Sequence, residues 1–428
     1  MPEGLHASSS PPPRAAVGQP LRVAMFVNEF PALSETFILN QITGLLDLGH
    51  DVTIFANNPR AEPGTHPDVM RYELYGRVRY REMPQDKLVR LAMAPRIFAR
   101  HGAHRKTLLK SLDLRRYRRE ATSLNMLYWS DRLLTQAPFD IIHCHFGIIG
   151  RQAAFFREVG ALSGKLVVTF HGVDMSACLD REPDLYRHLF AKGDLFLPIS
   201  DRWRKRLLEH GADPERTTVH RMGIDPFRFP LTERGPARDG IWRVLTIGRM
   251  VEKKGIEYGL RAVATLAGRG VPVRYDIVGD GPLRPRLEAL AQEAGIADRV
   301  AFHGWRVQGE VAELMRDSDV LLAPSVTDAD GDQEGIPVTI MEAMATGLPV
   351  VSTRHSGIPE LVDNGRTGFL ASERNVEELS DSLHTLLRSP SLCREMGFEG
   401  RKKVVAEYNI ETLNRQLEAK YRSLLTPV

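Results

Sequence analysis

The sequence predicts an α/β protein built from two doubly wound domains. The chain has 428 residues, too many for one ordinary core. Short apolar runs that end in Gly or small polar residues alternate with helical segments, which is typical of parallel sheets. The alternation stops in a linker rich in Pro, Gly and charge at residues 226–240, and then begins again. These three observations together predict two domains joined by a linker.

Composition places the chain among soluble globular proteins, because 43% of its residues are hydrophobic and 26% are charged. No apolar run approaches the ~18 residues that span a bilayer. The three cysteines are far apart and form no CxxC pair, which indicates a reducing compartment and argues against a zinc site or a disulfide framework. Residues 1–20 lack the apolar core of a signal peptide, and their Ser, Pro and Ala content predicts a disordered leader. We therefore expect a cytoplasmic protein.

The first domain is expected over residues 21–225. It opens with the buried strand RVAMFVN, and a helix follows whose apolar residues recur at helical spacing from Phe37 to Leu46. Ser34 is the expected N-cap of this helix, and Gly49 is its expected C-terminal stop. The strands predicted for this domain cover residues 22–28, 51–56, 140–147, 165–172 and 194–200.

The second domain is expected over residues 241–404 and repeats the same alternation. A helix is predicted from Ile256 to Leu266, and a further helical stretch is expected over residues 405–428. Each predicted strand ends in Gly or small polar residues, and ligands meet parallel sheets at the carboxyl ends of their strands. The strands predicted here cover residues 242–248, 273–281, 299–305, 319–325 and 348–354.

A strongly basic segment runs from Arg77 to Arg119. It holds fourteen Lys and Arg residues against three Asp and Glu residues, a net charge of +11 in a chain whose total is +3. Apolar residues at spacings of three and four lie among the cations, which predicts amphipathic helices. Two interpretations stay open: the helices lie on an anionic membrane surface, or they present a solvated basic face while packing on their own domain. Nucleic acid is disfavoured, because aromatic residues are sparse there and no recognisable binding module is present.

The stretch QEGIPVTIMEAMATGLPVV places two glutamates eight positions apart. A helix is predicted from Pro337 to Thr346, because Pro suits a first turn and Gly-Leu-Pro follows. Glu334 then lies on the loop before the helix, where backbone N–H groups and the helix dipole favour an anion. Glu342 lies in apolar surroundings, which is costly unless the carboxylate is paired or accepts hydrogen bonds. Ligand hydroxyl groups and an ordinary structural ion pair are both open as its partners.

Two cations and a histidine lie at further predicted strand ends. Arg249 and Lys254 flank a strand-to-helix turn, where an Arg fork and a Lys point charge can clamp a diphosphate. Solvated loop charges are the alternative for this pair. His171 ends a buried strand in VTFHGVDMS, where it can donate to a sugar hydroxyl or a phosphate, or can have a purely structural role.

The turn NEFPALSETFI has the place of a phosphate loop but lacks its glycines. Ser34, Glu35 and Thr36 make it a candidate acceptor or phosphate loop, and a plain capped helix start is equally consistent. The segment TDADGDQEG (327–335) carries three aspartates, but its glycine has the wrong offset for an EF-hand and no Glu occupies the twelfth place. No metal is therefore expected. GDGPLR (279–284) lacks the full GxGxxG pattern and indicates a dinucleotide only weakly.

In their order, these stretches resemble the family-4 retaining glycosyltransferases of the GT-B fold, and within them the bacterial exopolysaccharide enzymes of the colanic-acid and amylovoran type. The resemblance covers nearly the whole chain, from Leu21 to about Tyr421. It implies two Rossmann-like domains that face each other across a cleft. The first loop departs from many family members, because NEFPALSE lacks their paired glycines. The resemblance is carried by FPALSETFI, HCHFG, TFHGVD, PISDRWRKRLLEHG, VHRMGIDPFRF, TIGRMVEKKG, IVGDGPLR, FHGW and EGIPVTIMEAMATGLPVVST.

The resemblance also implies roles for individual residues. Glu342 would bond the ribose hydroxyls of a nucleotide-sugar, and Glu334 would contact the donor sugar. Arg249 and Lys254 would hold the diphosphate and stabilise the departing charge, while His171 would hydrogen-bond the sugar close to the reacting centre. The remaining donor contacts would come from Gly335, Ile336, Pro337 and Val338 near sugar and phosphate, and from Gly279, Gly281, His303, Gly304 and Trp305 around the base.

The implied function is transfer of a hexosyl group from a nucleotide-sugar, with UDP preferred over GDP, to a glycan acceptor in exopolysaccharide or cell-surface polysaccharide biosynthesis. Retention of configuration is expected, without a metal or cofactor. The first domain would hold the acceptor, expected to be a polyprenyl-diphosphate-linked glycan, and residues 405–428 would return to that domain. The basic segment 77–119 would bring the enzyme to the inner face of the cytoplasmic membrane. Alternatives are an epimerase or a sugar phosphorylase of the same fold and, in another class, a peripheral membrane scaffold with a degenerate transferase core.

Overall fold

The computed structural model describes residues 18–32, 35–59, 66–117, 119–232 and 239–426. It contains two six-stranded sheets, with the orders β3-β2-β1-β4-β5-β6 and β12-β11-β10-β7-β8-β9. Counted from its own first strand, each sheet runs outward through three strands and then resumes on the other side of that first strand. This is the doubly wound Rossmann order, whose ligand position is the switch point where the direction reverses. The predicted α/β class with two doubly wound sheets is confirmed.

The first sheet is parallel in the registers between β1, β2, β3 and β4. The interior of β1, Val23–Val27, is buried, as expected for a strand covered on both faces. The five strands predicted for this region are present, and the three-residue β3 was not predicted. The strands are β1 (Arg22–Phe30), β2 (Asp51–Pro59), β3 (Val78–Tyr80), β4 (Ile141–His145), β5 (Lys165–Phe170) and β6 (Leu195–Pro198).

The helix predicted after β1 is α1 (Thr36–Asp47), whose Ile38, Ile42 and Leu45 are buried. Gly49 follows it with φ 84°, which suits a helix stop. The N-cap predicted at Ser34 lies outside the described residues. The other helices of this half are α2 (Pro67–Arg71), α3 (Leu74–Arg77), α4 (Lys87–Arg100), α5 (Arg105–Lys110), α6 (Leu114–Tyr117), α7 (Arg119–Thr122), α8 (Asn125–Leu133), α9 (Gly147–Val159), α10 (Ala177–Arg181), α11 (Arg187–Lys192) and α12 (Asp201–Glu209).

The neighbouring strands of the second sheet pair in parallel, and β12 is the strand that was not predicted. Its strands are β7 (Trp242–Ile247), β8 (Val273–Val278), β9 (Val300–Gly304), β10 (Val320–Ala323), β11 (Val350–Thr353) and β12 (Gly368–Ala371). The helices in this half of the chain are α13 (Ile256–Gly268), α14 (Arg284–Glu293), α15 (Gln308–Asp317), α16 (Val338–Ala345), α17 (Ile358–Leu361), α18 (Val376–Leu387), α19 (Pro390–Glu407) and α20 (Ile410–Leu425).

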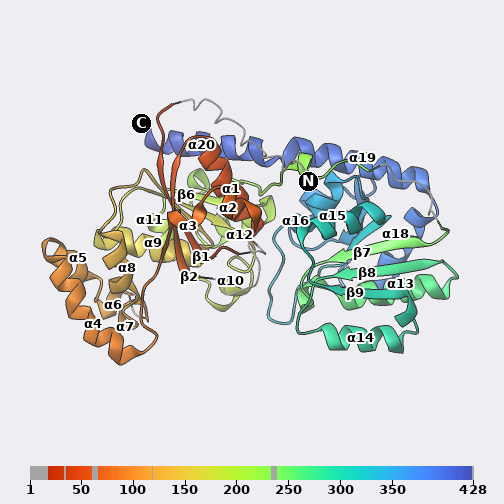
Figure 1. Ribbon diagram of the computed structural model, residues 1–428, viewed down its shortest axis with the longest axis horizontal. Coiled ribbons are helices and arrows are strands. Elements are labelled where there is room, and N and C mark those ends of the chain that lie inside the picture. Colours follow the sequence, from red (N-terminus) through yellow and green to blue (C-terminus); the bar gives the residue numbers. More distant parts are fainter. Residues whose placement is uncertain (1–17, 33–34, 60–65, 118, 233–238, 427–428) are drawn as a thin grey trace, which may run out of the picture. The chain divides into compact units, whose positions relative to one another are not determined.

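Contacts divide the chain into two compact units: residues 1–145, 149–167 and 414–428, and residues 146–148 and 168–413. In the first unit, α4 to α8 form a helical lobe (Figure 1). Most of α20 belongs to that unit, where the Tyr421 hydroxyl and His143 Nδ1 share a hydrogen bond. In the second unit, α13 and α18 pack on the sheet through one apolar core. None of the described helices is long and apolar enough to cross a membrane. The predicted domain boundaries stay predictions.

Candidate functional site

Glycine-containing turns meet at the carboxyl ends of β7, β8 and β9. Gly279 has φ 122° and donates its N–H to Gly304 O at 2.9 Å. A Cβ on Gly279 would lie 2.1 Å from Gly248 O, and a Cβ on Gly281 would lie 2.6 Å from Met250 O. Only glycine fits at these two positions, because a side chain would strike the neighbouring backbone. The sheet thereby presents close-packed main chain at the edge where the base was expected.

His303 and Trp305 belong to the same edge and have different surroundings. His303 Nε2 lies 2.7 Å from Asp276 Oδ1, so the imidazole is held by a carboxylate of β8. Trp305 is 65% exposed, which leaves its ring available for stacking. The expected contact role of these two residues stays a prediction.

Lys254 and Glu334 form an ion pair, with 3.1 Å between Nζ and Oε1 and side chains 20% and 11% exposed. The lysine stem packs over Gly248, whose added Cβ would lie 3.2 Å from Cδ and Cε. Burial raises the pKa of the Glu334 carboxyl, but the charges of Lys254 and then Lys253 lower it by more than burial raises it. The net shift of this pKa is therefore downward. The structure therefore joins two of the predicted site residues as a charged pair.

The aspartates of the loop before Glu334 fold that loop. Asp328 accepts hydrogen bonds from the N–H groups of Asp330 at 3.0 Å and Asp332 at 2.8 Å. Lys253 Nζ pairs with Asp332 Oδ2 at 2.8 Å. Over the described ranges, no group of three or more His, Cys, Asp or Glu side chains could hold a metal ion. The loop thus uses its acidic side chains for its own conformation, and metal independence stays a prediction.

Arg249 differs from Lys254. It directly follows the turn after β7 and is exposed. No side chain or carbonyl among the described residues hydrogen-bonds or pairs with its guanidinium. Because the Arg249 guanidinium has no such partner in the described part of the chain and lies next to the glycine turns, it can reorient to bind a phosphate.

Glu342 lies in the middle of α16, which confirms the helix predicted over residues 337–346 to within one residue at each end. Its neighbours Ile340, Met341, Ala343 and Met344 are buried. No hydrogen bond or ion pair from the described part of the chain reaches its carboxylate, so the ordinary structural ion pair is not what holds it. Burial raises its pKa to about 7. The group is a carboxylate that lacks donors.

His171 follows the end of β5 and is buried, and its Nδ1 lies 3.2 Å from Met222 Sδ. Its main chain packs against the loop of Glu334. A Cβ on Gly335 would lie 2.3 Å from His171 O, and a Cβ on Gly172 would lie 3.1 Å from Gln333 O. The structure therefore brings the backbones of these two predicted stretches into direct contact within one unit.

Asp174 is a residue of this site that the sequence reasoning did not single out. Its carboxylate accepts hydrogen bonds from the N–H groups of Gly147 at 3.0 Å, His171 at 3.1 Å and Gly172 at 2.9 Å. Burial raises its pKa, and these backbone bonds oppose the rise. Asp174 fixes the turn that carries His171. The spacing of three residues in HGVD was the available signal.

His355, Ser356 and Glu373 were also missed. They contact the main chain of Glu334 or the start of its loop, from positions 21 to 46 residues away in sequence. No sequence spacing connects them.

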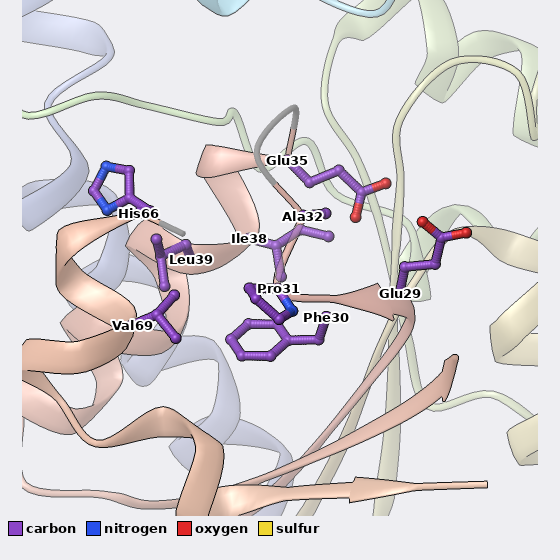
Figure 2. Close-up of a pocket in the computed structure, with 9 residues that line it drawn as sticks. All are labelled: Glu29, Phe30, Pro31, Ala32, Glu35, Ile38, Leu39, His66 and Val69. Carbon is purple, nitrogen blue, oxygen red and sulfur yellow. The ribbon is translucent and has the colours of Figure 1, made fainter. Parts of the chain in front are cut away.

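The loop after β1 was predicted to hold Ser34, Glu35 and Thr36. Ser34 lies outside the described residues, Glu35 precedes α1, and Thr36 is its first residue. Figure 2 shows the carboxylates of Glu35 and Glu29 near each other, directed away from Leu39 and His66. The pocket beside them has a volume of about 10 Å³, room for roughly one water molecule. The acceptor or phosphate role expected of Ser34, Glu35 and Thr36 stays a prediction.

A larger hollow of about 480 Å³ lies at the amino ends of β7, β8 and β9, the opposite edge of the second sheet. Parallel sheets bind ligands at their carboxyl ends, so this hollow is separate from the site. It is lined by Ile241, Pro272, Val273, Arg274, Asp298, Arg299, Val300 and Ala301.

Comparison with known proteins gives concordant matches. Residues 34–228 match the family described as "Glycosyltransferase Family 4", and residues 231–403 match "Glycosyl transferases group 1". A putative colanic acid biosynthesis glycosyltransferase, WcaL, of Salmonella typhimurium is 39% identical over 404 residues, covering 93% of this chain and 98% of the relative. The amylovoran biosynthesis glycosyltransferase AmsK of Erwinia amylovora is 36% identical over 408 residues, 93% of this chain and 98% of that one.

Solved structures agree at the level of the fold. The crystal structure of Anabaena Alr3699/HepE in complex with UDP and glucose has a TM-score of 0.68 at 17% identity, covering 94% of this chain and 100% of that one. Sucrose-phosphate synthase from Thermosynechococcus elongatus has a TM-score of 0.67 at 20% identity, covering 95% and 99%. Both are GT-B structures, so the predicted GT-B fold is confirmed.

Fold and sequence together define the class of protein as a glycosyltransferase of the GT-B type. More narrowly, the chain belongs to glycosyltransferase family 4, is a hexosyltransferase, and is similar over nearly its whole length to WcaL and AmsK. The predicted family is thereby confirmed.

Proposed function

We propose that this enzyme transfers a hexosyl group from a UDP-sugar, with retention of configuration and without a metal, to a lipid-linked glycan in exopolysaccharide biosynthesis. The observation that carries the proposal is that the buried carboxylate of Glu342 has no hydrogen-bond or ion-pair partner among the described residues. A carboxylate in the middle of α16, with no donor from the described residues, is costly by itself and becomes favourable when ligand hydroxyl groups supply the donors.

The donor would lie along the carboxyl edge of the second sheet, at its switch point between β7 and β10. Glu342 would accept hydrogen bonds from the ribose hydroxyls. The glycine turns of β8 and β9, with Trp305, would border the base. UDP is the preferred nucleotide because the structurally similar Anabaena protein was crystallised with UDP and glucose.

Cleavage of the sugar–phosphate bond leaves positive charge at the anomeric carbon and negative charge on the departing diphosphate. Arg249 and Lys254 would stabilise the diphosphate, and the N-terminus of α16 adds its dipole. The acceptor hydroxyl oxygen would form the new glycosidic bond on the face that the diphosphate leaves, and its proton would pass to the leaving phosphate oxygen. Glu334 and His171 would hold the sugar during this exchange, so no enzyme nucleophile is needed.

The role in polysaccharide synthesis comes from the relatives, whose names concern colanic acid and amylovoran. A polyprenyl-diphosphate-linked glycan is the proposed acceptor. The test is to incubate the enzyme with UDP-, GDP- and ADP-hexoses in EDTA, with and without a membrane extract that contains lipid-linked glycans, and to measure nucleotide release. Acceptor-dependent UDP release supports the proposal. Sugar conversion without an acceptor would indicate an epimerase, dependence on inorganic phosphate a phosphorylase, and no binding of any nucleotide a scaffold.

We further propose that α4 docks this enzyme on an anionic bilayer. One face of α4 packs on its own domain through Ala94 and Ile97, in a cluster with Leu108. The opposite face carries exposed apolar residues at helical spacing, beginning with Leu88 and Leu91, which are 77% and 64% exposed. This face continues through Ala92, Pro95 and Ala99, all exposed.

Cations are numerous on α4 and on the helices that follow it, α5 and α6. Some are committed, since Arg100 pairs with Asp131 at 2.8 Å, and Arg118 lies outside the described residues. Others are exposed and have no carboxylate partner in the described part of the chain: Lys87, Arg96, Arg105, Lys106, Lys110 and Arg115. Exposed leucines bordered by unpaired cations match an anionic lipid surface better than they match water alone.

Vesicle sedimentation tests the docking. We expect binding to phosphatidylglycerol vesicles, little binding to phosphatidylcholine vesicles, and a loss of binding as salt rises. Leu88→Ser with Leu91→Ser should reduce binding about tenfold. The matched control is Phe398→Ser, which changes a side chain that is 59% exposed on α19. Equal binding by the double variant and the wild type, or salt-independent binding, would overturn the proposal.

A further inference from the structure

Both main-chain polar groups of Glu334 are held by consecutive side chains that follow β11. His355 Nε2 accepts the N–H of Glu334 at 3.0 Å, and Ser356 Oγ donates to the carbonyl of Glu334 at 2.5 Å. The His355 side chain is fully buried. These contacts fix the backbone of Glu334 independently of Lys254, which holds its carboxylate.

The first contact determines the protonation of His355. A backbone N–H can only donate, so Nε2 must carry no proton. The imidazole proton then lies on Nδ1, 2.6 Å from Glu373 Oε1, where it donates to a carboxylate. Glu373 and the amide of Glu334 therefore fix one neutral tautomer of His355. This is the arrangement by which an outer carboxylate orients a histidine toward a functional group.

Glu373 also reaches the other end of the same loop. Its Oε2 accepts the Thr327 N–H at 2.8 Å, and its Oε1 lies 3.3 Å from Thr327 Oγ1. One carboxylate thus connects to Thr327 directly and to Glu334 through His355. The eight residues from Thr327 to Glu334 are closed into a loop by side chains that come from outside it.

The backbone of Ser356 is strained, and the presence of serine at this position indicates a role for its hydroxyl group. Ser356 has φ 49°, a left-handed conformation that glycine adopts more easily. The next residue, Gly357, packs closely against Ile336, because a Cβ added to this glycine would lie 2.8 Å from Ile336 Cγ1. A serine at the strained position keeps the Oγ contact to Glu334 that glycine would lose.

We infer that His355, Ser356 and Glu373 are positioning residues that hold the Glu334 backbone where its carboxylate can meet the donor sugar. The inference rests on the proposed function only for the identity of the ligand. The positioning itself is a property of the protein and can be measured without any nucleotide.

Two isosteric variants separate the two hydrogen bonds of His355. His355→Gln can place an amide oxygen where Nε2 accepts the Glu334 N–H. His355→Asn can place an amide N–H where Nδ1 donates to Glu373, but it cannot reach Glu334. Both remove the same ring, so they serve as matched controls for packing. Ser356→Gly removes the hydroxyl and relieves the left-handed strain, so it should not lower the melting temperature.

The first measurement is hydrogen exchange of the segment covering residues 328–336 in the protein without ligand. We expect exchange about fivefold to tenfold faster in His355→Asn and Ser356→Gly, and near wild type in His355→Gln. The second is binding: His355→Asn should weaken the affinity for UDP-hexose about tenfold while that for UDP stays unchanged, because Glu334 contacts only the sugar.

Equal exchange in all variants, or equal effects of Asn and Gln, would overturn the inference. Exchange that differs as expected, combined with no binding of UDP or UDP-hexose by the wild type, would keep the positioning role and reject the proposed donor. A fall in melting temperature of Ser356→Gly that alone accounts for its faster exchange would reduce Ser356 to a structural residue.

Discussion

Glu334 and Glu342 lie eight residues apart, on either side of the start of one helix, and their pKa values are shifted in opposite directions. Glu334 is paired with Lys254, and after burial is counted its pKa is still lowered. Glu342 has no donor among the described residues, and burial alone raises its pKa to about 7. Glu334 is fixed and charged before a ligand arrives, whereas Glu342, in the proposed function, would gain its hydrogen bonds from the ligand.

Under the proposed function, this difference corresponds to two tasks within one site. A group near the reacting carbon must be placed accurately, so side chains hold both its carboxylate and its backbone. A group that recognises a ribose can remain unsatisfied, because the ligand completes it and the gain is then large. Each of the following predictions alters one side of the comparison.

The largest effect is expected from Lys254→Met, which removes the partner of Glu334 and, under the proposed function, a cation for the diphosphate. We expect kcat/KM for sugar transfer to fall about 10²–10³-fold. Lys253→Met is the matched control, because Lys253 is buried to a similar degree but pairs with Asp332. Initial rates with saturating acceptor give the comparison. Equal losses in the two variants would show that the position of Lys254 has no special role.

A smaller effect is expected from pH. The free enzyme holds a proton on Glu342 below pH about 7, and a protonated carboxyl cannot accept two ribose hydroxyls as a carboxylate does. Affinity for a UDP-hexose should therefore be about tenfold weaker at pH 6 than at pH 8. The intact sugar nucleotide is preferable to UDP, whose terminal phosphate itself titrates near ~6. Glu342→Gln should abolish this dependence, and a dependence that survives in the variant would assign it to another group.

The smallest effect is on stability. Because the pKa of Glu342 is higher in the folded state than in the unfolded chain, its contribution favours folding at low pH and is lost as pH rises through about 7. Without ligand, Glu342→Gln should melt about 2–4 °C higher than the wild type at pH 8, with a much smaller gain at pH 5. Thermal unfolding at the two pH values is the measurement. A variant that is less stable at pH 8 would indicate that Glu342 has a donor in the free enzyme.

Local patterns were sufficient for most of the fold. The predicted helix over 337–346 is α16 within one residue at each end, because a Pro and a Gly limit it. The missed strands lack a local signal: β3 has three residues inside the basic segment, and β12 begins with Gly368. They become strands because their backbones hydrogen-bond to the neighbouring strands β2 and β11, which is a tertiary effect.

The candidate residues named from the sequence are those with a charge or ring of their own, and those missed have side chains that contact main-chain groups. Glu334 and Lys254 were named from their charge and do form a pair. Asp174, His355 and Glu373 contact backbone groups whose positions depend on the folded loops. The partners of His355 and Glu373 cannot be found by spacing in the sequence, whereas Asp174 lies only three residues from His171 and that spacing was an available signal.

Binding of a donor ribose by Glu342 can be measured by titration calorimetry of UDP at pH 8, with EDTA, on the wild type and Glu342→Ala. We expect the variant to lose about 1.5–3 kcal/mol of binding free energy, roughly a 10- to 150-fold rise in Kd, while its fold is retained. Equal affinity in the two proteins would contradict the ribose assignment, and no UDP binding by the wild type would contradict the proposed donor.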